Sequence, residues 1–468
     1  MASEIQDKIV RIGGGQGFWG DWLLAPGRLV RASIKAGKQL DYLVLDYLAE
    51  VTMSILAKQR ESSPETGYAR DFPGLVSELL PELQNESANL KIIANAGGLN
   101  PRACAEECRR QIASHSLFKK MPKIAVIEGD DIFPRFSELS SKGESFFHLE
   151  DGRSIEEVKS NLKSLNVYIG AKSVKEALDA GAQIIISGRV ADPCLALGAL
   201  MHEFDWKSTD YDLLASGVVA GHVIECGAQS SGGNFSAGWE EVKDSWDIGF
   251  PVVECKANGE IVVTKPEGTG GIVDRRTVTE QLVYEIGDPK CYITPDVIVD
   301  FTSFTVSDLA IDRVLIKGVK GLPAPEKLKV SGSFFAGYFA EGTLVLVGPK
   351  VKKKAKICEE IIRKRIELSS INYDELHFEY LGTFSCIPGL SERLSYSEPG
   401  EIVFRVAIRG KSKSDILRFT REIAPLVLGG PSGVTGYAGG KRDVRELYAY
   451  WPSLVSREFV KESWSILE

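Results

Sequence analysis

The richest run of reactive side chains in the sequence is GHVIECGAQSSGGNF, residues 221–235. His222 and Glu225 lie three residues apart in it, among apolar residues and glycines. A carboxylate can take and return a proton, while backbone amides in a glycine-rich turn can hold an oxygen that gains negative charge. We therefore predict His222 and Glu225 as catalytic residues. The predicted substrate contacts from this run are Gln229, Gly232, Gly233 and Asn234.

Other chemistry is conceivable for the same run. The spacing of His222 and Glu225 is also that of an incomplete metal site, but zinc needs at least a third protein ligand that the sequence does not identify, so we predict no metal. Cys226 has no assigned base, and we interpret it as a buried thiol rather than a nucleophile. The sequence lacks a G-x-S-x-G motif, which disfavours a serine hydrolase of the usual α/β type.

The run SGRVADP, residues 187–193, follows a continuous apolar stretch and holds Arg189 and Asp192. An arginine offers planar donors suited to a carboxylate or phosphate, so we predict that Arg189 binds substrate, with an ion pair to a neighbouring element as the alternative. Asp192 directly precedes a proline, which is typical of a helix N-cap. It is also the third candidate catalytic residue.

Glycine-rich runs follow other apolar stretches, beginning with IVRIGGGQGFWGD at residues 9–21. Glycine lets the backbone approach a bound group closely, so such turns can present N–H groups to an anion; tight packing is an equally good explanation. The first run fits neither the P-loop nor, except loosely, the dinucleotide fingerprint. The predicted substrate-binding residues from these runs are Gly13, Gly14, Gly15, Gly17, Asp21, Asn95, Gly97, Gly98, Thr269 and Gly270. A further loop at residues 428–443 has similar composition and also fits a flexible lid.

Continuous apolar runs alternate with helical patterns through the first two hundred residues. This alternation predicts an α/β domain with a mostly parallel sheet, whose ligands sit at the carboxyl ends of the strands. We prefer an open sheet. A closed βα barrel is the alternative, because residues 170–189 have the short strand–helix–strand pattern that is common in barrels. The predicted strands cover residues 9–12, 42–46, 90–96, 123–129, 167–171 and 183–188.

The sequence pattern changes after about residue 205. Residues 206–325 are rich in glycine and in short strands, including a hairpin at Asn258-Gly259. Residues 326–468 read as an α+β section of the split-βαβ kind. We therefore predict three domains: an α/β ligand-binding domain over 1–205, a β-rich section over 206–325 that completes the site, and the α+β section over 326–468.

Composition excludes several classes of protein. The net charge of −8, from 64 acidic against 56 basic residues, disfavours binding to nucleic acid. No apolar run approaches the roughly 20 residues that cross a bilayer, so no membrane association is predicted. The polar N-terminal residues lack a secretory signal, which indicates a cytoplasmic protein.

Six runs together resemble one family. GGGQGFWGD, NAGGLNP, SGRVADP, GHVIECGAQSSGGNF, KPEGTGGIV and GVKGLPAPEKLKVS occur in this order and are similar to the acyclic terpene utilisation protein AtuA family over nearly the whole chain. The resemblance implies a place beside acyl-CoA carboxylases and dehydrogenases of branched-chain or terpenoid breakdown. It therefore implies an acyl thioester, such as a CoA thioester, or a related carboxylic acid as substrate. It carries no residue roles.

We accordingly expect an enzyme of acyl-CoA or branched carboxylic-acid catabolism, of the lyase or hydratase type. It would bind a small anionic substrate, form a homo-oligomer, and need no cofactor that the sequence identifies. Two alternatives remain open. One is a non-catalytic accessory or binding subunit of an acyl-CoA carboxylase; the other is an ATP-dependent acid ligase, which the lack of a Walker-type lysine disfavours.

Overall fold

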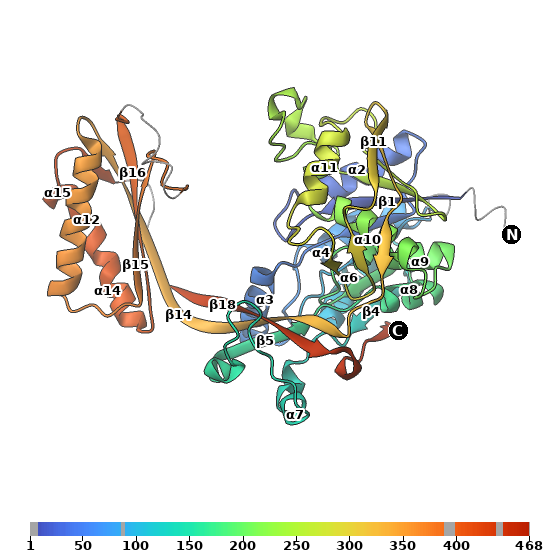
Figure 1. Ribbon diagram of the computed structural model, residues 1–468, viewed down its shortest axis with the longest axis horizontal. Coiled ribbons are helices and arrows are strands. Elements are labelled where there is room, and N and C mark those ends of the chain that lie inside the picture. Colours follow the sequence, from blue (N-terminus) through green and yellow to red (C-terminus); the bar gives the residue numbers. More distant parts are fainter. Residues whose placement is uncertain (1–7, 86–88, 388–397, 437–442, 468) are drawn as a thin grey trace. The chain divides into compact units, whose positions relative to one another are not determined.

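The computed structural model describes residues 8–85, 89–387, 398–436 and 443–467. The chain separates into two compact units (Figure 1): a larger one of residues 1–333 and 450–468, and a smaller one of residues 334–449. The smaller unit is thus an insertion near the C-terminal end of the larger one. The three domains predicted from the sequence, with boundaries near 205 and 325, stay a prediction.

Five parallel strands form the centre of the main sheet of the larger unit. Across the sheet their order is β1-β2-β3-β6-β4, so β6 is inserted between β3 and β4. Most of their residues are buried, as expected for strands covered on both faces. The strands span Ile9–Gln16 (β1), Tyr42–Leu45 (β2), Lys91–Ala94 (β3), Ile124–Glu128 (β4) and Ile184–Ser187 (β6).

Antiparallel strands extend this sheet at both sides. Beyond β1 lie β7, β8, β12 and β11 in that order, and beyond β4 lies β19. The sheet therefore ends at β11 and β19 and is open, as predicted; within the described residues it forms no closed barrel, so that alternative is wrong. The strands span Val252–Lys256 (β7), Ile261–Thr264 (β8), Thr305–Ala310 (β11), Arg313–Lys317 (β12) and Ser463–Ile466 (β19).

Helices cover both faces of the sheet. Side chains of alternate strand positions, such as Leu43 and Leu45, share one apolar core with helices that follow β1, β2 and β3. The other face contacts α8, α9 and α10. The first group is α2 (Ala25–Lys35), α3 (Glu50–Ser62), α4 (Phe72–Glu78), α5 (Leu80–Leu83) and α6 (Pro101–Ser114); the second is α8 (Lys172–Asp179), α9 (Cys194–Phe204) and α10 (Tyr211–Glu225).

One predicted strand is misplaced. Residues 167–171 make only an isolated bridge, between Ile169 and Val190, and the strand lies earlier, as β5 (Leu162–Val167). β5 pairs with β14 (Lys327–Val347) instead of joining the main sheet. Its sequence LKSLNV is interrupted by polar residues, so it lacks the continuous apolar signal of a strand buried on both faces.

Shorter elements complete the larger unit. They are α7 (Phe136–Ser141), α11 (Arg275–Val283), a three-stranded sheet of β13 (Lys320–Leu322), β10 (Ile298–Asp300) and β9 (Tyr292–Ile293), and the 3₁₀ turns η1 (Phe133–Arg135), η2 (Ile155–Glu157), η3 (Lys159–Asn161), η4 (Gln229–Ser231), η5 (Trp239–Glu241), η6 (Ser245–Asp247) and η7 (Arg457–Phe459).

The smaller unit is an antiparallel sheet with helices packed on it. Its strand order is β15-β16-β14-β17, and the chain passes through β14, α12, β15, β16, α14 and β17 in sequence. This is the order of a split βαβ fold. The bounds are α12 (Val351–Leu368), β15 (Glu375–Leu381), β16 (Glu401–Gly410), α14 (Lys413–Ile423), α15 (Leu426–Gly429), β17 (Val434–Gly436) and β18 (Arg445–Ser456), the last of which pairs with β14.

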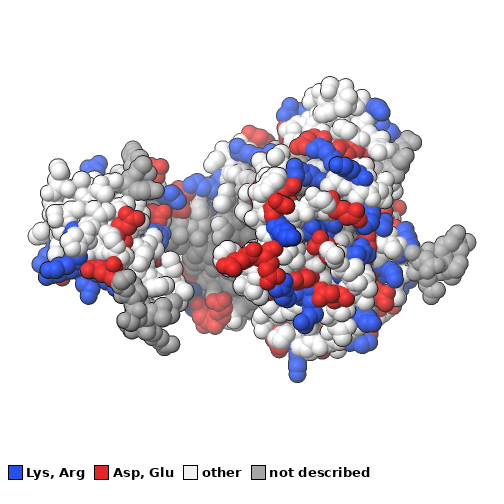
Figure 2. All heavy atoms as spheres, turned by 90° about the horizontal axis from the view of Figure 1, so that it is seen from above, with Lys and Arg blue, Asp and Glu red and all other residues white. Residues whose placement is uncertain are grey.

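Two surface properties bear on function. Among the described helices, none is long and apolar enough to cross a membrane. Over the described residues on the face that Figure 2 shows, basic and acidic side chains are interspersed rather than gathered in one broad patch.

Candidate functional site

A cavity of about 810 Å³ opens at the carboxyl ends of the parallel strands in the larger unit. Its lining takes Gly17 from the end of β1, Asp46 from the end of β2, Arg189 and Asp192 from the turn after β6, and Glu225 from the last residue of α10. Ligands of open α/β sheets bind at this edge. The volume lies in the range of small-molecule sites.

His222 and Glu225 form a buried acid–base pair at the end of α10. His222 Nδ1 lies 2.7 Å from Glu225 Oε1, and His222 Nε2 lies 3.1 Å from the carbonyl oxygen of Gln281. Because a carbonyl only accepts, Nε2 must carry a proton. Nδ1 therefore faces the carboxyl of Glu225. Glu225 Oε2 is buried without a hydrogen-bond partner, although the residue lines the cavity.

The surroundings of His222 fix its ring. Tyr292 and Phe301 pack on the imidazole with ring centroids 5.5 Å and 5.4 Å away. Burial lowers the pKa of His222, but the charge of Glu225 and the hydrogen bonds to Glu225 and Gln281 outweigh burial and raise it. The imidazole therefore holds its proton more tightly than a free histidine.

Asp46 is a buried carboxyl at the end of β2 that a second residue holds in place. Asn95 Nδ2 donates to Asp46 Oδ1 at 2.6 Å, and the backbone N–H of Leu48 donates to the same oxygen at 3.2 Å. Asn95 Oδ1 in turn accepts from the backbone N–H of Tyr47 at 2.7 Å. Burial first, and then the neighbouring charge of Asp192, raises the pKa of Asp46 well above its usual value.

Arg189 is a fully buried cation whose terminal nitrogens are all engaged. Nη1 donates to the carbonyl of Leu48 and, at 3.0 Å, to Asp192 Oδ1; Nη2 donates to the hydroxyl of Tyr168 at 3.1 Å. The guanidinium also lies 4.3 Å from the centre of the Tyr168 ring. Its Nε is buried without a partner. Asp130 Oδ2 accepts from the backbone N–H of Arg189 at 2.9 Å and so fixes the turn.

Asp192 faces Arg189 rather than the helix that follows it. The predicted N-cap is wrong, because Pro193 occupies the N-cap position of α9 and the Asp192 side chain accepts no hydrogen bond from the helix. The carboxylate instead accepts a hydrogen bond from the buried guanidinium of Arg189. Burial raises the pKa of Asp192, Arg189 lowers it, Glu225 and Glu50 raise it, and the result is a pKa of about 7. Asp192 is therefore suited to exchange a proton near neutral pH.

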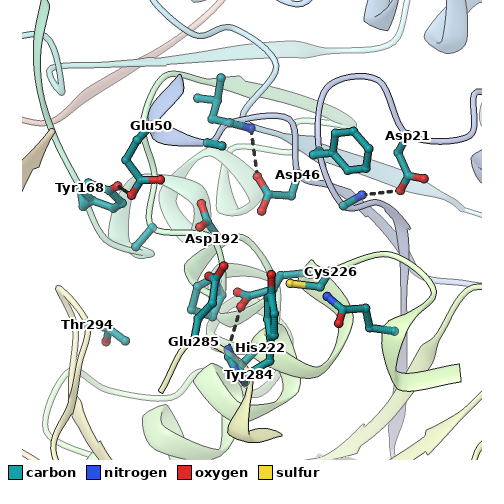
Figure 3. A pocket seen from close by; sticks show the side chains of 18 of the residues that line it. Asp21, Asp46, Glu50, Tyr168, Asp192, His222, Cys226, Tyr284, Glu285 and Thr294 are labelled. Carbon is teal, nitrogen blue, oxygen red and sulfur yellow. Dashed lines mark hydrogen bonds and ion pairs between the residues drawn. The ribbon is translucent and has the colours of Figure 1, made fainter. Parts of the chain in front are cut away.

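Glu50 and Tyr168 connect this cluster to the cavity rim. The Tyr168 hydroxyl donates to Glu50 Oε1 at 2.7 Å, and Lys329 Nζ lies 3.5 Å from the same oxygen. In Figure 3 Glu50 and Tyr168 lie together, Asp46 and Asp192 lie between them and Cys226, and Asp21 lies apart. Burial raises the pKa of Glu50, but the Tyr168 hydrogen bond and the nearby cations lower it to about 2.

The sequence profile of the acyclic terpene utilisation family protein AtuA matches residues 10–466. The chain belongs to the AtuA family. The matched range includes residues of both units. A search of curated proteins finds no match to this AtuA-family chain.

Eight of the predicted site residues line the cavity of this AtuA-family protein. The structure thus brings together side chains from the turn after β1, the turn after β6, the end of α10 and the segment behind it. Their predicted roles stay predictions. They are Gly17, Asp21, Arg189, Asp192, His222, Glu225, Gln229 and Asn234.

Three predicted glycines lie inside β1 and have a packing explanation. A Cβ on Gly14 would lie 2.3 Å from the carbonyl oxygen of Ile224, and one on Gly13 or Gly15 would meet leucine side chains within 2.9 Å. The run is therefore strand rather than loop up to Gln16, and it allows α10 to approach the sheet. Gly17, the next glycine, lines the cavity; its N–H donates to Asp21 Oδ2 at 2.9 Å.

The remaining predicted residues lie outside the lining of the cavity. Asn95 stands behind Asp46, and Gly97, Gly98, Gly232, Gly233, Thr269 and Gly270 shape nearby turns. Thr269 Oγ1, for example, donates to the carbonyl of Pro266 at 2.6 Å. The glycine-rich loop at 428–443 belongs to the smaller unit, and its residues 437–442 lie outside the described residues.

Several cavity residues were not predicted from the sequence. Asp46 carried a usable signal, because an acid that directly follows a buried parallel strand sits at the ligand-binding edge. The others come from a helix start, from turns, from a short strand and from the start of the long strand β14, and only the folded chain brings them here. The unpredicted charged or aromatic residues that line the cavity include Asp46, Glu50, Tyr168, Glu285, Tyr292, Lys327 and Lys329.

More acidic side chains line the cavity than a binding site for an anion would be expected to have. Six acidic side chains line it, against three basic ones, Arg189, Lys327 and Lys329. Among the described residues, no group of three or more His, Cys, Asp or Glu side chains is placed to hold a metal ion. Asp192, whose pKa is about 7, is a group in this wall that can exchange a proton near neutral pH.

Proposed function

We propose that this AtuA-family protein is an enzyme that moves a proton on an acyl compound, in a reaction of the lyase or hydratase type. The observation that carries the proposal is Glu225, a residue of the cavity lining whose Oε1 lies 2.7 Å from His222 Nδ1 while its Oε2 is buried without a partner. A carboxylate with one oxygen fixed and the other unpaired is suited to act as a general base.

In this scheme two groups act in turn. Glu225 takes the proton from the carbon next to the acyl carbonyl, and a carbon–carbon double bond forms as the bond to a hydroxyl on the next carbon breaks. Asp192, with a pKa of about 7, gives its proton to that hydroxyl, which leaves as water. Hydration is the reverse. His222 holds Glu225 in place, because its Nε2 is fixed to Gln281 and its Nδ1 faces the carboxyl.

The charges favour an acyl thioester over the free acid. Arg189 already donates three of its five N–H groups to Asp192, Tyr168 and a carbonyl, which leaves its Nε–H and one Nη2–H for a ligand. A free carboxylate would also lie among six acids. The thioester carbonyl is neutral, and Lys327 and Lys329 in the wall of the cavity are suited to phosphate groups of a carrier such as CoA.

The test is turnover by Glu225→Gln. We expect a loss of about 10²–10⁴-fold in kcat for the thioester that the wild type turns over best from a panel, with its binding retained. Glu285→Gln is the matched control, since Glu285 also lines the cavity and acts on His222 only through its charge, whereas Glu225 lies 2.7 Å from the imidazole. Equal loss in both variants, or full activity in Glu225→Gln, contradicts the role of Glu225. A wild type that turns over no thioester while binding a carboxylase would instead favour an accessory subunit.

A further inference from the structure

Several large apolar side chains that line the cavity are exposed. Phe18, Trp22, Trp246, Tyr284 and Ile293 are all more than a third exposed, and all line the cavity. Trp246 is the extreme case, with 77% of its surface exposed. Apolar side chains gathered at one hollow, rather than scattered over the surface, are typical of a binding site.

Arg28 holds two of these side chains in position. Its guanidinium lies 5.5 Å from the centre of the Trp22 ring, and its Nη2 forms an ion pair with Asp247 Oδ1. Asp247 directly follows Trp246 in η6. One arginine on α2 therefore ties the turn after β1 to the segment that carries Trp246. We call Phe18, Trp22, Trp246 and Phe250 the apolar wall; all four line the cavity.

The apolar wall is continuous with the acid–base pair. Gln229 and Asn234 line the same cavity, as do Glu225 and Cys226 at the end of α10. A ligand whose reacting end lies at Glu225 can therefore extend along the wall. The volume of about 810 Å³ exceeds what a short acyl group needs.

We propose that the apolar wall binds a long, flexible hydrocarbon chain of about eight carbons or more, attached to an uncharged reacting group, and that Arg28 is the positioning residue of this wall. The inference deepens the proposed function, because it names the class of acyl chain. Chain binding itself does not require that Glu225 be catalytic. The two ideas can thus fail separately.

The experiment measures binding of neutral 1-alkanols, from butanol to decanol, by isothermal titration calorimetry on the full-length protein. In the wild type we expect Kd to fall roughly fourfold for each added methylene. Trp246→Ala and Arg28→Ala should weaken decanol binding about tenfold and leave butanol binding almost unchanged. Glu225→Gln should keep the same fourfold dependence on chain length, because it changes only the site of the reacting end.

Two variants serve as matched controls. Trp239 is 67% exposed but does not line the cavity, and Arg31 lies one turn from Arg28 on α2 with exposed ion pairs to Glu78 and Glu82. Trp239→Ala and Arg31→Ala should therefore bind decanol like the wild type. Thermal unfolding of each variant checks that the larger unit remains folded.

Three results would overturn the inference. The first is alkanol binding with no dependence on chain length, and the second is an equal effect of Trp239→Ala and Trp246→Ala. The third is a change of oligomeric state in Trp246→Ala, seen by light scattering, with alkanol binding intact; the wall would then be an interface between copies of the chain. A chain-length dependence together with a fully active Glu225→Gln would support this inference and refute the proposed function.

Discussion

Gly14→Ala tests how closely the first strand must approach α10. The new Cβ would lie 2.3 Å from the carbonyl oxygen of Ile224 and 2.8 Å from its Cβ, whereas ordinary contacts begin at 3.4 Å. The backbone must therefore separate by about 1 Å at this point. β1 has little freedom to move, because Gly14 pairs with Val44 on one side and its N–H donates to the carbonyl of Pro251 on the other, at 3.0 Å.

The expected cost has two components. Overpacking against backbone destabilises the larger unit by roughly 1–3 kcal/mol, with the upper part of that range expected here because neither partner is a flexible side chain. Ile224 directly precedes Glu225, so the same displacement moves the proposed base. A shift of about 1 Å in a catalytic group reduces turnover by roughly 10²-fold.

Thermal unfolding and turnover on the same samples measure both components. Gly287→Ala is the control, because a Cβ there meets nothing within 4 Å and the backbone is not left-handed. Its stability should stay within about 0.5 kcal/mol of the wild type. If Gly14→Ala unfolds at the same temperature as Gly287→Ala and keeps full turnover, the packing explanation for the glycine run is refuted.

Two further predictions concern titratable groups. Interaction with Glu225 raises the pKa of His222 despite burial. The stability that this pair contributes is therefore present below pH 6.5 and is lost as pH rises through the higher pKa of the folded state. Over that window the melting temperature of the wild type should fall relative to that of His222→Gln. Burial and the charge of Glu225 raise the pKa of the Cys226 thiol, whereas Cys291 and Cys386 are exposed. Iodoacetamide at pH 8 should therefore label Cys291 and Cys386 before Cys226, as followed by mass spectrometry. Faster labelling of Cys226 would contradict this environment of the thiol.

The sequence predicts the parallel core well because burial on both faces leaves a strong local signal. All five central strands coincide with continuous apolar runs, and the split βαβ unit follows from its alternating pattern. β5 escapes prediction because polar residues interrupt it and its partner β14 is more than a hundred residues away. Likewise, residues 327–332 and 343–347 look like two strands in sequence, although one long strand spans both.

The site was predictable only in part. His222, Glu225, Arg189 and Asp192 stand out because polar side chains follow or interrupt apolar runs, and all four line the cavity. The sequence could not show that Arg189 is hydrogen-bonded to Tyr168 and Asp192, since these contacts depend on segments that come together only in the folded chain. Glycine content alone predicted substrate contacts at Gly13 to Gly15, which instead have a packing explanation. Close helix–strand packing and anion binding both require glycine, so the sequence does not distinguish them.

The position of β19 has a consequence for synthesis of the chain. This strand covers the edge of β4 and is made only after the entire inserted unit has been synthesised. At ordinary elongation rates the delay between the two strands is on the order of tens of seconds. During translation β4 therefore presents an uncovered edge, of the kind that recruits chaperones or neighbouring nascent chains.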